Sequence, residues 1–180
     1  MTGEQSGVAV PQCFGMMTLP MVSFRIVSFR TATEKDAGAI ARVVNTAFLV
    51  EQFFIERDRT NPEAVRGLME KGNFLLAEEE TNLLGCIYFE TRGDRGYFGM
   101  LSIEPSRQGT GIGHRLVNAV EKHFRDAGCK FCDLKIVDVR TELHDLYHRW
   151  GYADTGTGVY DDPTPTKIPV RFILMAKPLL

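Results

Sequence analysis

The sequence predicts an α/β (α+β) fold in which a central mixed, mostly antiparallel sheet of six to seven strands is flanked by about four helices. Three observations lead to this prediction. Apolar residues recur at helical spacing in several segments, short apolar runs separated by turn residues follow one another in mid-chain, and a strand–helix–strand unit after residue 97 implies one parallel pair. The 180 residues form most simply one domain with a full core.

Residues 1–22 contain glycine, proline and polar residues without a period, so we expect a flexible N-terminal tail ahead of a single domain at residues 23–180. The first strand is expected within residues 23–31. Thr33 then caps a helix whose apolar positions run from Ala37 to Phe48. Asn61 and Pro62 begin a second helix, which Gly72 ends.

The middle of the chain is typical of an antiparallel meander followed by a helix. Strands are expected at residues 74–79, 83–91 and 97–103. The helix of residues 111–127 turns an apolar stripe toward the sheet, with Glu121, Lys122 and Arg125 opposite. The stripe consists of Ile112, Leu116, Val117, Val120 and Phe124.

The C-terminal part adds a strand at residues 131–137, parallel to the third strand of the meander if the connection crosses over as usual. Thr141 is expected to cap a short helix, which Gly151 ends. A final hairpin at residues 152–160 and 170–177 encloses a proline-rich loop.

The composition limits which binding partners and which cellular compartment we expect. A net charge of -2 gives no basic footprint for nucleic acid, and no apolar run reaches the length of a membrane span, so we expect neither partner. Cys129 and Cys132 form a C-x-x-C at the start of a strand, without a second pair to complete a four-cysteine zinc site. With Cys86 in an apolar strand, the thiols fit a reduced, cytoplasmic protein.

A glycine-rich turn between a strand and a helix stands out as an anion site. Gly109, Gly111 and Gly113 can adopt backbone angles closed to other residues, and the unpaired N–H groups of the helix start face whatever ligand lies there. A phosphate-binding P-loop would need Lys-Ser or Lys-Thr after the last glycine, where His114 and Arg115 stand instead. The dinucleotide pattern G-x-G-x-x-G fits only weakly, because the sixth position counted from Gly109 is His114.

The turn resembles the Q/R-x-x-G-x-G/A signature of the GCN5-related N-acetyltransferases (GNAT family). The strand Leu101-x-Ile103-x-Pro105 before it and the segment 146–152 after it resemble that family in the same order. The resemblance implies acetyl-CoA as the acyl donor, with Arg107, His114 and Arg115 as candidate charges near its phosphates. It implies a cofactor site made of the strand edge Leu101, Ser102 and Ile103 and the turn Gln108, Gly109, Thr110, Gly111, Ile112, Gly113 and His114.

The resemblance also points to Tyr147 as the general acid that faces the departing sulfur. A free tyrosine has a pKa near 10 and a thiol one near 8.5, so full proton transfer costs about 2 kcal/mol. Tyr147 would therefore act by hydrogen bonding and partial transfer; the alternative is a buried tyrosine that only packs. The base for the amine stays open among Glu104, Glu90, Glu51 and a water chain.

His144 and His148 share one helix face and could bind zinc. No third ligand is evident from the sequence, so we expect no metal. Residues 51–60 place aromatic side chains among charges. They either cover the acceptor pocket, as this region commonly does in the resembled family, or pack on the sheet.

The resulting functional prediction is transfer of an acetyl group from acetyl-CoA to a primary amine, of a small molecule first and of a protein or peptide second. The alternative class is a non-catalytic module that binds acyl-CoA. Because many members of the resembled family pair, a homodimer is compatible with the sequence, although no residue specifies one.

Overall fold

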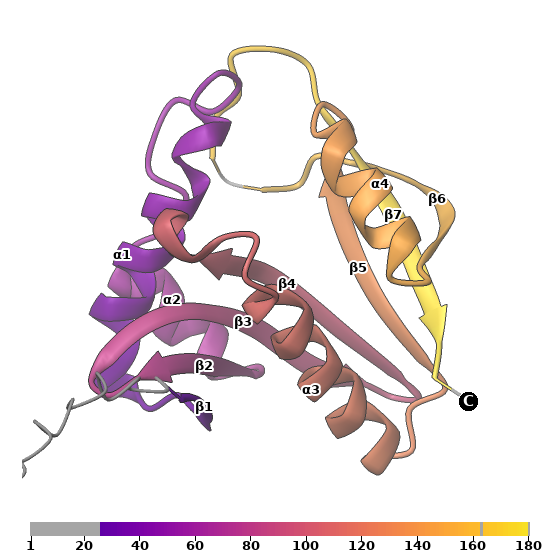
Figure 1. Cartoon of the computed structure of the whole chain (residues 1–180). Helices are drawn as coiled ribbons and strands as arrows, with labels where there is room; N and C mark the ends of the chain where they lie inside the picture. Colours follow the sequence, from indigo (N-terminus) through magenta and orange to yellow (C-terminus); the bar gives the residue numbers. More distant parts are fainter. Residues whose placement is uncertain (1–25, 163, 180) are drawn as a thin grey trace, which may run out of the picture.

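The computed structural model describes residues 26–162 and 164–179. The expected tail, Cys13 and the start of the expected first strand lie outside the described residues, and the domain boundary at residue 23 stays a prediction. The described strands form one sheet in the order β1-β2-β3-β4-β5-β7-β6 (Figure 1). They are β1 (Val27–Thr31), β2 (Asn73–Glu79), β3 (Asn82–Arg92), β4 (Arg95–Ile103), β5 (Phe131–Val137), β6 (Ala153–Val159) and β7 (Arg171–Pro178).

Within the described residues four α-helices flank this sheet, so the predicted fold class is confirmed. They are α1 (Ala37–Ala47), α2 (Pro62–Met69), α3 (Ile112–Asp126) and α4 (Thr141–Arg149), with short 3-10 turns at Glu34–Asp36, Phe48–Glu51 and Pro105–Arg107. No helix in the described part of the chain combines the length and apolar character that a membrane crossing needs.

The local signals for α1 and α2 are largely confirmed. The backbone N–H of Thr33 donates to the Asp36 carboxylate at 2.7 Å, and a 3-10 turn leads from there into α1. The side chain of Asn61 accepts from the backbone N–H of Ala64 at 2.8 Å and so caps α2. This helix ends at Met69, and α4 begins at Thr141 itself, one residue before its expected start.

Alternate side chains of β3 belong to two hydrophobic clusters, one on each face of the sheet. Cys86 and Tyr88 pack with α1 and α2 on one face, while Ile87 and Phe89 pack with α3 on the other. This period of two follows from the pleat of a strand. Tyr147 of α4 belongs to the same core cluster as α3, so both helices cover the same face of the sheet, with α3 over β2, β3 and β4.

The parallel pair β4–β5 is short, and this opens the sheet. Register is kept only from Arg95 to Tyr97 against Phe131 to Asp133, and beyond it the two strands diverge (Figure 1). A β-bulge on β4 adds to the divergence, because Met100 and Leu101 stand opposite the single residue Ile87. Met100 takes a left-handed backbone conformation there, with φ 50°.

The apolar stripe of α3 is buried as predicted, but the expected position of Glu121 is wrong. Its side chain is only 2% exposed and belongs to the buried face. Its carboxylate accepts hydrogen bonds from the Tyr152 hydroxyl at 2.8 Å and from the Lys177 ammonium at 2.9 Å. A carboxylate can be buried in this way only because charged and polar donors replace water around it.

Candidate active site

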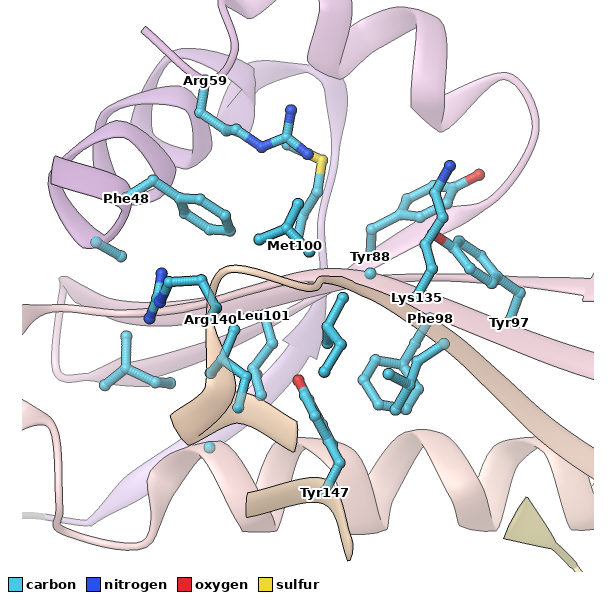
Figure 2. Close-up of a pocket in the computed structure, with 18 of the residues that line it drawn as sticks. Phe48, Arg59, Tyr88, Tyr97, Phe98, Met100, Leu101, Lys135, Arg140 and Tyr147 are labelled. Carbon is cyan, nitrogen blue, oxygen red and sulfur yellow. The ribbon is translucent and has the colours of Figure 1, made fainter. Parts of the chain in front are cut away.

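A cavity of about 1170 Å³ occupies the opening between β4 and β5. One end is formed by the turn that leads into α3. The other end is formed by the residues that follow α1 and by the loop between β6 and β7. Figure 2 shows side chains from both halves of the sheet, including Phe48, Arg59, Lys135, Arg140 and Tyr147, around this cavity.

The turn before α3 has the conformation that the glycine pattern predicts. Gly109 and Gly111 both take left-handed angles, with φ 74° and 84°. The N–H of Arg115 makes the first helical bond of this turn, to the carbonyl of Gly111 at 3.1 Å. The N–H groups of residues 112–114 therefore come before the first helical hydrogen bond. They point outward from the N-terminal end of α3.

Two side-chain hydrogen bonds hold this turn, one to the end of β4 and one within the turn. The Gln108 amide nitrogen donates to the Ile103 carbonyl at 3.1 Å, and the Thr110 hydroxyl donates to the Arg107 carbonyl at 2.6 Å. The turn is thus held in place before any ligand arrives, which lowers the ordering cost of binding.

Eight of the ten predicted cofactor-binding residues line the cavity. They are Leu101, Ile103, Gln108, Gly109, Gly111, Ile112, Gly113 and His114. The side chains of the other two face elsewhere: Thr110 bonds within the turn, and Ser102 is buried with its hydroxyl donating to the Met100 carbonyl at 3.1 Å. Contacts from the main chain of these residues stay a prediction.

The three candidate cations of the turn have different surroundings. His114 lines the cavity and stacks on Trp150 with ring centroids 4.9 Å apart. Arg107 also reaches the cavity wall, but its guanidinium forms a two-pronged ion pair with Glu79 at 2.9 and 3.0 Å. Arg115 donates to the Val27 carbonyl at 3.3 Å and lies over the Phe29 ring, so its side chain is engaged with β1 instead.

Tyr147 lies on the cavity side of α4. Its side chain packs edge-on against Trp150 with centroids 5.4 Å apart and next to Phe98 at 6.0 Å. Figure 2 shows its hydroxyl pointing into the cavity toward β4. Burial raises the pKa of Tyr147 well above its ordinary value, so the hydroxyl keeps its proton at neutral pH and can act as a donor.

The carboxylates named as candidate bases separate into two groups. Glu51 and Glu90 line the cavity, whereas Glu104 lines a smaller pocket beside Arg42 and Glu79. Burial raises the pKa of Glu51, although Arg59 and Arg140 oppose this effect. Burial also acts on Glu90, but hydrogen bonds from Tyr88 and Arg92 outweigh it and lower the pKa of Glu90. Glu51 is therefore the stronger base of the two.

Contacts between distant segments close the end of the cavity opposite the turn. Arg140 binds Glu51 at 2.9 Å, and Arg59 binds Asp162. A β-bridge joins Ile55 to Thr166, beside a bond from the Lys167 N–H to the Phe54 carbonyl at 2.7 Å. We call residues 51–59, 160–162 and 164–167 together the roof; Figure 1 shows the loop after β6 arching over to the segment after α1.

Residues 51–59 of the roof pack on the sheet and also face the cavity, and the role of covering an acceptor stays a prediction. Phe54 and Ile55 are buried against Val137 and Phe172 of the C-terminal half, while Glu51 and Arg59 face the cavity. Sequence reasoning missed Arg59, Arg140 and Asp162, because partners such as Glu51 and Arg140 stand 89 positions apart and share no local pattern.

Residues 44–152 match the model of the acetyltransferase (GNAT) family, and the chain belongs to that family. The prediction made from the glycine turn and its neighbours is thereby confirmed. The chain is similar to an amino-acid acetyltransferase of Ralstonia nicotianae, with 32% identity over 117 residues. It is also similar to an IAA acetyltransferase of Azospirillum brasilense, with 30% identity over 108 residues.

These matches cover different shares of each protein. The first spans 63% of this chain but only 24% of the Ralstonia relative, and the second spans 59% of this chain and 67% of the Azospirillum relative. Among solved structures, YncA of Salmonella typhimurium, solved with its cofactor acetyl-CoA, superposes with a TM-score of 0.66 at 18% identity, over 86% of this chain and 94% of YncA. This likeness shows a shared fold.

Proposed function

We propose that the protein is an N-acetyltransferase that transfers the acetyl group of acetyl-CoA to a primary amine of a small molecule. One observation carries the proposal: the left-handed glycine turn, the divergent strand β4 and the Tyr147 hydroxyl all face one cavity. Family membership and the acetyl-CoA held by YncA support the choice of acyl donor.

In this proposal the start of α3 holds the pyrophosphate. The amides of residues 108–113 and the positive end of the helix dipole suit a doubly charged group, and His114 adds a donor on the same wall. Acetyl-CoA, when bound, supplies the thioester. A main-chain N–H at the strand edge formed by Leu101, Ser102 and Ile103 then donates to the thioester oxygen as it gains charge.

The reaction exchanges one bond for another. The amine nitrogen forms a bond to the acetyl carbon while the bond from that carbon to sulfur breaks, one proton leaves the nitrogen, and one proton reaches the thiolate. Tyr147 donates the hydrogen bond that stabilises the departing sulfur. Glu51 accepts the amine proton, since its raised pKa makes it the stronger base among the two candidate carboxylates in the cavity.

The roof favours a small acceptor over a polypeptide. Ion pairs, a β-bridge and a main-chain hydrogen bond hold the roof across the end of the cavity opposite the glycine turn. An extended peptide needs an open groove along which its backbone can lie. The similarity to a protein named amino-acid acetyltransferase points the same way.

Calorimetric titration with acetyl-CoA, followed by a screen of amines for thiol release, tests this function. We expect one-to-one binding and thiol release that depends on a small amine. Binding without acceptor-dependent release from any amine or peptide would indicate the non-catalytic module instead. Release with peptides alone would move the acceptor to the protein class, and no binding of acetyl-CoA would refute the proposal.

Tyr147→Phe removes only the hydroxyl that faces the cavity. We expect turnover to fall by about a hundredfold, the lower end of what a general acid contributes, while the calorimetric affinity for acetyl-CoA changes little. Tyr152→Phe is the matched control, because its hydroxyl bonds to Glu121 in the core and lies outside the cavity wall. Unchanged turnover in Tyr147→Phe would remove this residue from the mechanism.

A further inference from the structure

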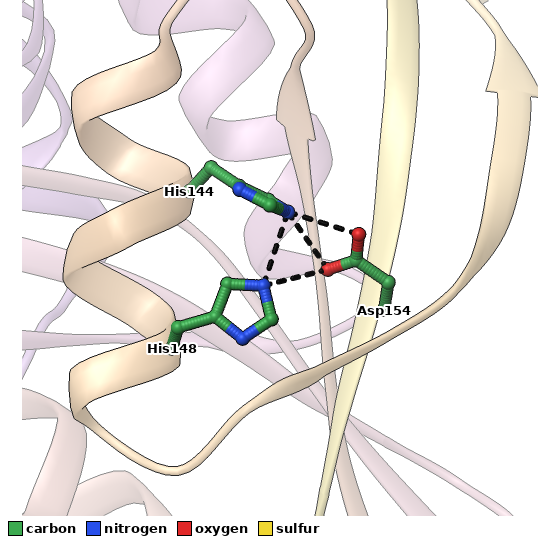
Figure 3. A group of neighbouring side chains, drawn as sticks. All are labelled: His144, His148 and Asp154. Atoms are coloured by element: carbon green, nitrogen blue, oxygen red, sulfur yellow. Dashed lines mark hydrogen bonds and ion pairs between the residues drawn. The ribbon is translucent and has the colours of Figure 1, made fainter.

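A cluster of three potential metal ligands lies outside the cavity, where α4 meets β6 (Figure 3). The Nε2 atoms of His144 and His148 are 3.1 Å apart. The Asp154 carboxylate lies 2.9 Å from Nε2 of His144 and 3.1 Å from Nε2 of His148. Three atoms that can each offer a lone pair therefore converge on one point.

Their spacing matches one face of a zinc tetrahedron. With zinc–nitrogen and zinc–oxygen bonds of about 2.0–2.1 Å, two ligand atoms in tetrahedral geometry stand about 3.3 Å apart. The three separations in this cluster are 3.1, 2.9 and 3.1 Å. A widening of a few tenths of an ångström, well within side-chain freedom, would accommodate the ion.

We propose that His144, His148 and Asp154 form a site for a zinc ion. Imidazole and carboxylate together suit divalent zinc and its first-row neighbours rather than calcium or magnesium. The three side chains are 31%, 43% and 48% exposed, which gives the ion a path of entry and lets water complete its coordination. The expectation of no metal rested on a missing third ligand, and Asp154 supplies one from a different element.

The backbone on both sides prepares this arrangement. The histidines are one helical turn apart on α4, so they share a face. On β6, Thr155 is an extra residue opposite β7, because Asp154 pairs with Met175 and Gly156 with Leu174. A bulge of this kind re-aims neighbouring side chains. The bound ion would cross-link α4 to β6. Because Tyr147 stands between the two histidines in the sequence of α4, the ion would also restrict the motion of the proposed acid; this last consequence rests on the proposed function.

The test is titration of the full chain with zinc chloride, followed by cobalt chloride as a spectroscopic probe. We expect one-to-one binding, a tetrahedral cobalt spectrum without a thiolate band, and a higher melting temperature in zinc. His148→Ala and the equal-sized Asp154→Asn should each weaken zinc binding at least about tenfold. Even residues that only hydrogen-bond to a metal ligand change metal affinity by about that much when they are replaced. His123→Ala, which removes an exposed histidine from α3, should bind as the wild type does.

Two results would overturn the proposal. One is a wild-type chain that binds neither metal at submillimolar concentration. The other is equal zinc affinity in the wild type, His148→Ala and Asp154→Asn, since the ion would then lie elsewhere. Melting of each variant without metal establishes that it is folded. Zinc binding is measured without acetyl-CoA, so its outcome is independent of whether the proposed activity is found.

Discussion

Gly111→Val is expected to weaken the binding of acetyl-CoA by about a hundredfold. The residue has φ 84°, where a β-branched side chain is strained by about 1–3 kcal/mol. Relaxing that strain would rotate the turn and re-aim the amides that begin α3. Strain and lost contacts together correspond to a loss on the order of a hundredfold. Calorimetric titration of the variant measures it directly.

Gly93→Val is the matched control for this substitution. Gly93 has φ 63° in the turn between β3 and β4, with open space around it as at Gly111, and it lies outside the cavity wall. It should therefore lose stability by a similar strain while it binds acetyl-CoA normally. Binding by Gly111→Val within about threefold of the wild type, a difference below 1 kcal/mol, would show that the turn does not hold the cofactor.

Local signals explain how much of this molecule the sequence predicts. The glycines of the turn, the Asn61 cap and the apolar stripe of α3 each act over a few residues, and the structure has each in place. The order from β2 to β5 also follows, because short turns dictate the meander and a helical crossover dictates the parallel pair. The place of β7 between β5 and β6 was not predicted. The family was predictable for the same reason, since its signature is local.

The features that sequence reasoning missed depend on contacts between distant segments. Arg140 finds Glu51 across the cavity, and Asp154 completes a cluster whose other members lie on α4. The periodicity of apolar residues along the sequence gives no information about such long-range contacts. Glu121 shows the limit most clearly: its neighbours Lys122 and Arg125 suggest a solvated face, yet its carboxylate meets Tyr152 and Lys177, which follow it by 31 and 56 positions.

Glu121→Leu is expected to destabilise the protein by about 3–5 kcal/mol, the usual cost of breaking a buried ion pair from one side. The substitution would leave the Lys177 ammonium, 22% exposed, without its carboxylate partner. It would also take the acceptor from the Tyr152 hydroxyl, which then retains only the Cys132 sulfur at 3.3 Å. Urea unfolding followed by circular dichroism measures the difference in free energy.

Two further variants separate charge burial from simple loss of packing. Lys122→Ala removes an exposed ion pair to Asp126 on the same helix and should change stability by less than about 1 kcal/mol. The double variant Glu121→Leu/Lys177→Met removes both charges, so it should regain much of the stability lost in the single variant. If the double variant were as unstable as Glu121→Leu alone, the unpaired ammonium would not be the cause. The loss would then belong to packing, to the Tyr152 hydroxyl and to Arg125, which also loses its ion pair with Glu121.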